Sequence, residues 1–224
     1  MKKTLLAIIM AACATSAFAE PTAVLKIKGV LTNSACTPEL SNSGVVDYGT
    51  IHLSELSDSA VNQLGQKTID LTITCDAETK VSWNLADDRV DSRAGVAVAN
   101  GSATNGSISD ANQTYGVGKT ADDVAIGNYS LFVKVSNVVA DGKSADTIYM
   151  LGNNNVWSAT TDGITEGQNN RDITVAASGS LEPVGFTTAT FPLVTSLAIQ
   201  DTKTLAITDD TDLNGQVTIS LRYL

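Results

Sequence analysis

The sequence is short of the residues that catalysis and metal binding require. Its 224 residues include one histidine, His52, and no Gly-x-Ser-x-Gly motif, so a serine hydrolase would have only His52 as its base and no nucleophile elbow. Its cysteines have no histidine nearby, which makes a poor zinc site. We therefore expect no catalytic residue, no metal and no cofactor, and we predict that the protein is not an enzyme.

Past its first residues, the sequence also lacks an apolar run long enough to cross a membrane. The run at its start, Leu5 to Ala12, follows Lys2 and Lys3 and precedes Ala-Phe-Ala at 17–19. These are the charged, apolar and small-x-small parts of a secretory signal peptide. We predict a signal peptide over residues 1–19, export from the cytoplasm and no transmembrane segment.

Basic residues are scarce. The chain has 14 Lys and Arg against 24 Asp and Glu, and two of the basic residues, Lys2 and Lys3, leave with the signal peptide. A strongly acidic chain repels the phosphates of nucleic acid, so we expect no nucleic-acid partner. Solubility outside the cytoplasm accounts for the acidity without a specific cation site.

The chain has three cysteines, and processing removes one of them. Cleavage after residue 19 takes away Cys13, whose alternative role as a lipoprotein cysteine fits poorly because Met10 is unusual in such a motif. Cys36 and Cys75 remain in an oxidising compartment, where two thiols normally form a disulfide. The bridge closes a loop of about 40 residues, worth on the order of 4 kcal/mol.

No stretch keeps an amphipathic helical period through three turns, whereas period-two alternation recurs. Short strands separated by turn residues about every ten positions predict an all-β sandwich with enlarged loops at 100–123 and 152–170. We find no linker or repeat, so residues 20–224 are predicted to form a single domain. The expected strands are 24–31, 45–51, 67–75, 81–85, one near 115, 129–135, 147–151, 173–177, 190–199, 204–207 and 217–224.

Two motif fragments carry little weight. The run Gly116 to Thr120 ends like a phosphate-binding loop, but Gln113 stands where the first glycine belongs. Asp210 to Gly215 matches the first half of a calcium loop, whose twelfth position would be Leu221 instead of glutamate. A polar turn before the last strand explains the second fragment equally well.

The last strand is the most informative stretch of the chain. On it, Val217, Ile219, Leu221 and Tyr223 share one side and Thr218, Ser220 and Arg222 the other, which predicts one buried and one wet face. A chain that stops inside such a strand must pair it with earlier strands or with an extended segment of another protein.

Several of these stretches together resemble the subunits of chaperone–usher fimbriae. The resemblance rests on Lys26 to Cys36, Val46 to Ile51, Ile69 to Cys75 and the penultimate Tyr223. The opening segments, Ala35 to Leu40 and 45–49, are more similar still to enterobacterial pilin-like secreted proteins of unsettled function. The middle of the chain, from about residue 85 to 200, resembles no family that we identify.

The resemblance implies an immunoglobulin-like, pilin-type sandwich that lacks its last strand and is completed by a donated one. It implies a periplasmic chaperone and an outer-membrane usher as partners, then other fimbrial subunits at the cell surface. The strand with Val217, Ile219, Leu221 and Tyr223 would bind the donated strand. The donor segment would carry the following residues: Ala23, Leu25 and Ile27.

Two departures from the fimbrial pattern leave alternatives open. The segment before the first strand is short, and Thr211 stands where these subunits usually have a glycine. The protein is therefore expected to be a structural or accessory fimbrial subunit, an adhesive binding module, or a free periplasmic pilin-like protein that does not polymerise.

Overall fold

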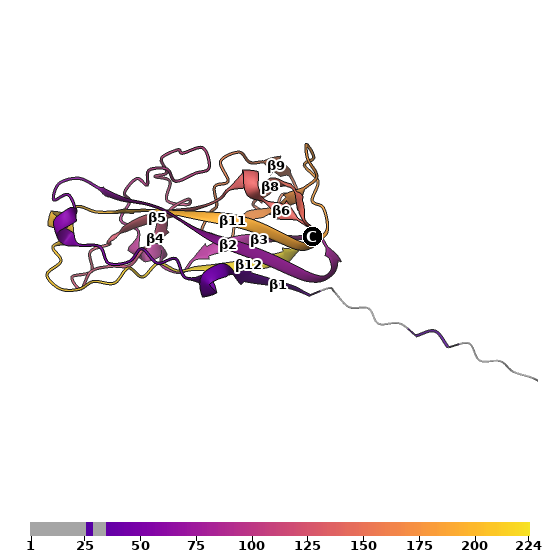
Figure 1. The fold of residues 1–224 in the computed structure, drawn as a ribbon, viewed down its shortest axis with the longest axis horizontal. Coiled ribbons are helices and arrows are strands. Elements are labelled where there is room, and N and C mark those ends of the chain that lie inside the picture. The colour runs from indigo at the N-terminus through magenta and orange to yellow at the C-terminus, as the bar shows by residue number, and fades with distance from the viewer. Residues whose placement is uncertain (1–25, 29–34) are drawn as a thin grey trace, which may run out of the picture. The chain divides into compact units, whose positions relative to one another are not determined.

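The computed structural model describes residues 26–28 and 35–224 (Figure 1). The chain divides into two units, Met1–Asn33 and Ser34–Leu224, and the β-sandwich lies in the second. The predicted signal peptide and donor residues Ala23 and Leu25 lie outside the described residues. So does most of the strand expected at 24–31, of which the described part, 26–28, is not in a strand. Ile27 is 91% exposed.

Two antiparallel sheets form the sandwich, as the alternating sequence predicts. The seven-stranded sheet has the order β1 (Cys36–Leu40), β2 (Asn62–Thr79), β11 (Phe186–Ile199), β5 (Gly127–Val133), β4 (Tyr115–Gly116), with β6 (Val139–Ala140) beside β11 and β7 (Lys143–Ser144) beside β6. The five-stranded sheet has the order β12 (Val217–Tyr223), β3 (Val81–Asp87), β10 (Arg171–Ala176), β8 (Asp146–Leu151), β9 (Trp157–Ala159).

Helical structure is confined to short segments among the described residues. The one α-helix is α1 (Thr202–Leu205), and the 3₁₀ turns are η1 (Ser41–Gly44), η2 (Leu53–Glu55), η3 (Val90–Ser92) and η4 (Val135–Asn137). In the part of the chain that the structure describes, no helix is both long enough and apolar enough to cross a membrane.

Alternation along the strands determines which side chains enter the core. On β2, Ile69, Leu71, Ile73 and Cys75 are between 0% and 6% exposed, while the residues between them face outward or lie half-buried. Each such buried apolar side chain stabilises the fold by about 1.5–3 kcal/mol. The core centres on Trp83, which meets Phe191 of the other sheet edge-on at 5.5 Å between ring centroids.

The two sheets differ in length: β2 has 18 residues and β11 has 14, against 7 each in β3 and β12. The last residues of β11, Leu197 and Ile199, belong to a second, smaller buried cluster. Its other buried members come from loops and from α1: Val117, Ile126 and Leu205.

Three segments differ from the predicted strands. Cys36–Leu40, which lies outside the expected strands, is the edge strand β1, where Pro38 is tolerated. Residues 45–51 are not a strand, because Asn42 and Ser43 turn the chain in the left-handed region. Residues 204–207 do not form a strand either. Thr204 and Leu205 are the last two residues of α1, and the carboxylate of its N-cap, Asp201, accepts from the Thr204 N–H at 2.9 Å.

The loop at 100–123 is less of a surface loop than its composition predicts. It includes the short strand β4, as expected near residue 115. Ile108, Tyr115 and Val117 are buried, and the Tyr115 ring stacks on Tyr129 with centroids 5.1 Å apart. These apolar anchors fix the loop to the sandwich.

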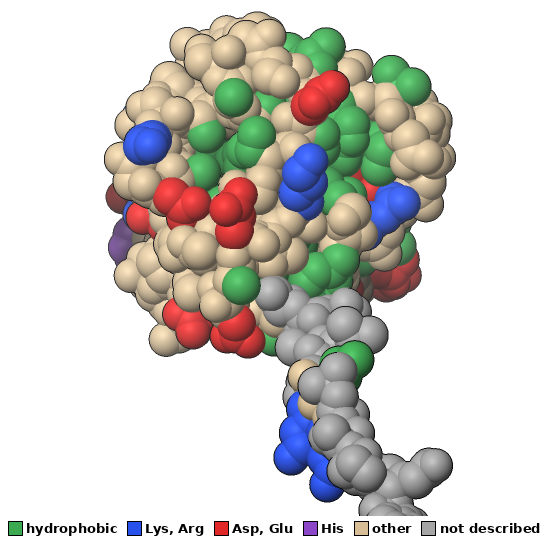
Figure 2. Space-filling view, turned by 90° about the vertical axis from the view of Figure 1, so that its right-hand side faces the viewer, with side chains coloured by type: hydrophobic (Ala, Val, Ile, Leu, Met, Phe, Trp, Pro, Cys, Tyr) green, Lys and Arg blue, Asp and Glu red, His purple; other side chains and the backbone are tan. Residues whose placement is uncertain are grey.

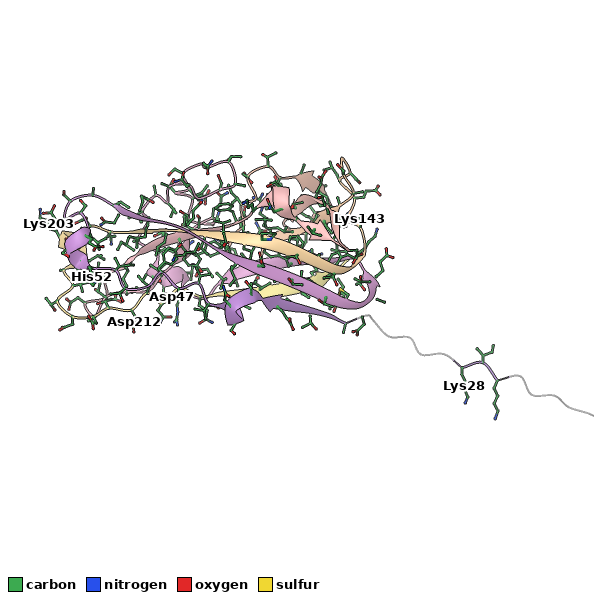
Figure 3. All side chains as sticks on the ribbon, in the orientation of Figure 1. Lys28, Asp47, His52, Lys143, Lys203 and Asp212 are labelled. Carbon is green, nitrogen blue, oxygen red and sulfur yellow. A yellow bond between two sulfur atoms is a disulfide. The ribbon has the colours of Figure 1, made fainter. Side chains whose placement is uncertain are left out.

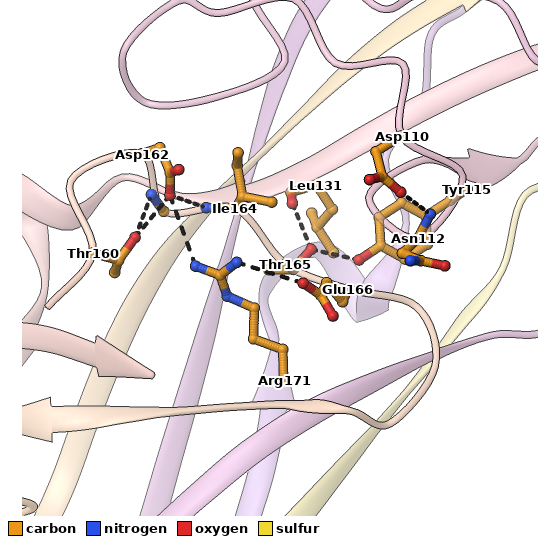
Figure 4. Close-up of polar contacts among 11 residues, drawn as sticks. Asp110, Asn112, Tyr115, Leu131, Thr160, Asp162, Ile164, Thr165, Glu166 and Arg171 are labelled. Atoms are coloured by element: carbon orange, nitrogen blue, oxygen red, sulfur yellow. Dashed lines mark hydrogen bonds and ion pairs between the residues drawn. The ribbon is translucent and has the colours of Figure 1, made fainter. Parts of the chain in front are cut away.

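Residues 160–167 connect the two sheets on one side of the sandwich: Ile164 bridges to Phe132 of β5, and the Asp87 N–H of β3 donates to the Gly167 carbonyl. Figure 4 shows the polar contacts of this segment. The Thr165 hydroxyl donates to the Leu131 carbonyl of β5 at 2.5 Å and accepts from the buried Tyr115 phenol. Burial raises the pKa of Tyr115 well above its usual value. This segment ties β5 to the five-stranded sheet through Arg171, the first residue of β10.

Arg171 is 7% exposed and anchors the segment 160–167. Its guanidinium lies 3.8 Å from the centre of the Tyr149 ring, a cation–π contact. Its terminal nitrogens are 3.9 Å from Asp162 and 3.7 Å from Glu166 (Figure 4). On the opposite side, β1 and β12 are the edge strands of their sheets, and no strand among the described residues pairs with either outer edge.

Candidate functional site

The candidate site lies between the edge strands of the two sheets, β1 and β12. Each is the terminal strand of its sheet. Among the described residues, no backbone hydrogen bond joins one to the other. They meet where the Cys36 N–H donates to the Tyr223 hydroxyl at 2.9 Å. Figure 2 views the molecule from the side on which Figure 1 marks the C-terminus, and hydrophobic side chains are visible on that face.

The strand β12 pairs with β3 along one edge, from Val217 opposite Asp87 to Tyr223 opposite Val81. Its other edge pairs with no strand of the described chain. Extended backbone whose amide and carbonyl groups are left without a neighbouring strand is a template for an added strand. This free edge borders the apolar interior of the sandwich.

An apolar cavity of about 190 Å³ lies alongside the free edge. Its floor is the inner face of the seven-stranded sheet. Val217 and Ile219 of β12 form one wall, and the segment 40–48 forms another. The lining residues are Leu40, Val46, Tyr48, Ile69, Val117, Tyr129, Leu131, Leu193, Thr195, Leu197, Leu213, Gly215, Gln216, Val217 and Ile219. We call this cavity and the free edge of β12 the edge groove.

Two tyrosines line the groove. The Tyr48 hydroxyl is 3.0 Å from that of Thr195, and burial raises its pKa despite this hydrogen bond. Tyr129 is buried more deeply, and burial raises its pKa well above the usual value. Both phenols stay neutral, so the groove is uncharged and apolar.

The predicted residues of β12 do not all lie where the alternation places them. Val217, Ile219 and Leu221 are half-buried against the core, whereas Tyr223 is 48% exposed. Arg222, expected to face water, is half-buried, and its guanidinium contacts the buried Asp172 carboxylate at 2.8 Å. Asp172 also accepts from the Asn84 amide at 2.9 Å.

The Arg222–Asp172–Asn84 network therefore spans β12, β3 and β10 on the outer face of the five-stranded sheet. Their spacing in the sequence does not indicate that these three residues are in contact, since 50 positions separate Asp172 from Arg222. Only the strand order brings them together.

The predicted disulfide is present, with Cys36 and Cys75 joined and their Cα atoms 4.0 Å apart. The two residues are directly opposite in the β1–β2 ladder. Cys75 faces the core, as its position in the alternation predicts. The bridge fixes the start of β1 at the end of the groove where Tyr223 lies.

A second, polar cavity of about 350 Å³ lies behind one wall of the groove. That wall is the segment 212–216, here called the wall segment. Leu213 and Gly215 line the apolar cavity, while Asp212 and Asn214 line the polar one. The polar cavity is completed by Arg89, Asp91, Ser92, Gly118 and Lys119.

Residues of both motif fragments line this polar cavity. Neither fragment has the geometry of the phosphate-binding or calcium-binding loop that it resembles in sequence. Lys119 forms an ion pair with Asp123 at 3.0 Å. The element after Lys119 is the strand β5 and not the helix that a phosphate-binding loop requires. In the described ranges, no group of three or more His, Cys, Asp or Glu side chains is placed to hold a metal ion. His52 and Asp212 lie toward the end of the sandwich away from Lys143 (Figure 3).

Comparison with known proteins places the chain in a family. A family model described as "Protein of unknown function (DUF1120)" matches residues 25–130. "Uncharacterized protein YhcF" of Escherichia coli (strain K12) is 30% identical over 227 residues, which cover 94% of each chain. The chain belongs to the DUF1120 family.

A further relative, "Protein GltF" of the same organism, is 30% identical over 225 residues, 89% of this chain and 87% of that one. The sequence-based likeness to enterobacterial proteins of unsettled function agrees with these matches. The DUF1120 match spans β1 to β4 and includes both cysteines of the disulfide, Cys36 and Cys75. It ends inside β5 and does not reach β12.

Proposed function

We propose that this DUF1120 protein is a structural or accessory fimbrial subunit whose edge groove receives an extended strand from another protein. One observation carries the proposal: the edge of β12 that pairs with no strand of the described chain runs beside an apolar cavity. An added strand can pair with the β12 backbone and place alternate side chains in the cavity.

The character of the groove supports an apolar strand as the occupant. Val217 and Ile219 flank the free edge, and the cavity holds no charged side chain. Burying a charge there without a partner would cost several kcal/mol, whereas each apolar side chain inserted would contribute about 1.5–3 kcal/mol. Alternating apolar residues are therefore the chemistry that fits.

The partners follow from the fimbrial resemblance. A periplasmic chaperone would lend the first strand, an outer-membrane usher would receive the complex, and another subunit would supply the final strand at the cell surface. A second copy of this chain could act as that subunit through its donor segment, Ala23, Leu25 and Ile27. This segment alternates in the required way but is short.

The test is partner capture by a variant that changes the groove without touching the sheets. Leu213 lines the cavity from the wall segment and is 37% exposed, so the carboxylate of Leu213→Asp reaches water while the groove is open and would be buried without a partner once a strand fills it. Leu181 is 49% exposed and does not line the cavity, which makes Leu181→Asp the matched control.

Each variant is exported in cells that express a fimbrial chaperone, and the protein is purified from the periplasm. We expect the wild type and Leu181→Asp to copurify with chaperone or as oligomers, and Leu213→Asp to be recovered alone. If the wild type is a partner-free monomer, the proposal is wrong, and the protein is a free periplasmic pilin-like protein. Binding of surface glycans by that monomer would favour an adhesive module instead.

A further inference from the structure

The chain contains three Asn-Gly pairs, Asn100-Gly101, Asn105-Gly106 and Asn214-Gly215. This dipeptide is the one most open to succinimide formation, because glycine has no side chain to hinder attack by its own backbone nitrogen. The structure places the three pairs in different surroundings. We propose that Asn214 is a site of spontaneous deamidation, promoted by Arg89, and the one that reacts first.

The first argument is the availability of the attacking nitrogen. The Gly101 N–H donates to the Gly106 carbonyl at 2.8 Å, and the Gly106 N–H donates to the Ser102 hydroxyl at 3.0 Å. Each nitrogen must break its hydrogen bond before it can react. The Gly215 N–H donates to no acceptor among the described residues.

The second argument is electrostatic. An Nη of Arg89 donates to the side-chain oxygen of Asn214 at 3.2 Å. Attack on the amide carbon moves negative charge onto this oxygen, and a guanidinium already placed against it stabilises that charge, as an oxyanion hole does. Arg89 forms no ion pair with a carboxylate of the described chain, so its charge is not offset by a fixed partner.

The step conserves atoms and changes no oxidation state. The Gly215 nitrogen gives its proton to water and attacks Cγ of Asn214. The new C–N bond closes a cyclic imide. The bond between Cγ and the side-chain nitrogen breaks, and this nitrogen takes the proton back from water and leaves as ammonia. Water then opens the imide at either carbonyl, which gives aspartate or isoaspartate at position 214. Overall, one water is consumed and one ammonia is released.

Both products change the wall of the groove. An aspartate at 214 places a carboxylate against Arg89, in a cavity that Asp91, Asp212 and Lys119 also line. Isoaspartate adds an atom to the backbone where a Cβ on Gly215 would already lie 2.9 Å from the Tyr129 ring. The wall segment then has to move away from Tyr129, which lines the edge groove.

The test follows the three pairs in one sample of the full-length exported protein. The protein is incubated in mildly alkaline buffer made with ¹⁸O-labelled water, and label incorporation at each asparagine is measured by peptide mapping. We expect Asn214 to react about tenfold faster than Asn100 or Asn105, the factor that about one intact hydrogen bond would impose. Equal rates, or an earlier reaction at Asn100 or Asn105, would overturn the proposal.

Two comparisons test whether the folded structure, and not the Asn-Gly dipeptide alone, sets the deamidation rates. In the reduced protein unfolded in urea, the three rates should converge, and a preference for Asn214 that persists there would count against a structural cause. In folded Arg89→Gln, the rate at Asn214 should fall several-fold while the rate at Asn105 stays the same, and Arg89→Lys should restore part of it. An unchanged Asn214 rate in Arg89→Gln would remove Arg89 from the proposal.

Discussion

The Tyr223 hydroxyl accepts a hydrogen bond from the Cys36 N–H at 2.9 Å, although 187 positions separate the two residues. This contact joins the edge strands of the two sheets at the end where the disulfide holds β1 to β2. The groove is therefore bounded at that end. Toward Val217, where the apolar cavity lies, it is not bridged in this way.

Replacing Tyr223 by phenylalanine keeps the ring and removes the acceptor for Cys36. We expect a loss of about 0.5–1.5 kcal/mol in the free energy of unfolding, the usual net worth of a hydrogen bond, with faster hydrogen exchange at the Cys36 amide. Tyr149→Phe is the matched control, because that hydroxyl has no hydrogen bond within the described part of the chain. Equal effects of the two substitutions would show that the contact does not join the strands.

Loss of the disulfide should cost more than loss of this hydrogen bond. Cys75→Ser opens a loop closed across 39 positions and buries a hydroxyl in the core, so we expect about 2–5 kcal/mol from urea denaturation. Cys36→Ser, at a half-buried edge position, should cost less than Cys75→Ser because its hydroxyl reaches water. Free thiols in the wild-type protein by non-reducing mass spectrometry would contradict the bridge.

The two faces of β12 should respond differently to charge. Leu221→Asp puts a carboxylate against the core without a partner, and we expect a loss of about 3 kcal/mol or more. The double variant Thr218→Lys, Ser220→Lys changes only exposed residues of the same strand and should fold normally. If both variants accumulate in the periplasm at the wild-type level, β12 does not pack as described.

Alternation in the sequence is a good guide wherever one face of a strand meets the core, as for residues 69–75 of β2. It is misleading for residues 45–51 and 204–207, where the left-handed turn at Asn42 and the Asp201 cap decide the local structure. The disulfide follows from counting cysteines. Sequence reasoning does not predict the contact of Arg222 with Asp172 or that of Tyr223 with Cys36. Each of these contacts depends on strands that are distant in the sequence and adjacent in the fold.

The segment 160–167 should depend on Arg171. Arg171→Met leaves the Glu166 carboxylate, whose side chain is 12% exposed, without its cation, whereas Asp162 is 41% exposed and stays in contact with water. We therefore expect a loss of about 1–3 kcal/mol, the cost of leaving one largely buried polar group without its partner. We expect protease cleavage in 152–170 to accelerate in this variant. Lys203→Met removes an ion pair with Asp58 whose side chains are 71% and 62% exposed and should have no measurable effect. Comparable losses in the two variants would show that Arg171 does not anchor the segment.

The Asp141 carboxylate, in the turn between β6 and β7, should make the stability of the protein depend on pH in acid. The Thr187 hydroxyl and the N–H groups of Thr188 and Thr187 donate to the Asp141 carboxylate, and together they lower its pKa below the usual range. Because the pKa is lower in the folded than in the unfolded state, these bonds stabilise the protein above the unfolded pKa of about 3.9, and the stabilisation disappears as the pH falls through the folded pKa.

Thr187→Val removes the hydroxyl, which is the largest contributor, so the pKa of Asp141 should rise toward its usual value when followed by NMR. The acid unfolding midpoint of this variant should move to higher pH. In Asp141→Ala the acceptor of these bonds is gone, so adding Thr187→Val to it should leave the midpoint where the single variant has it. A further shift in the double variant would place the effect of Thr187 outside Asp141.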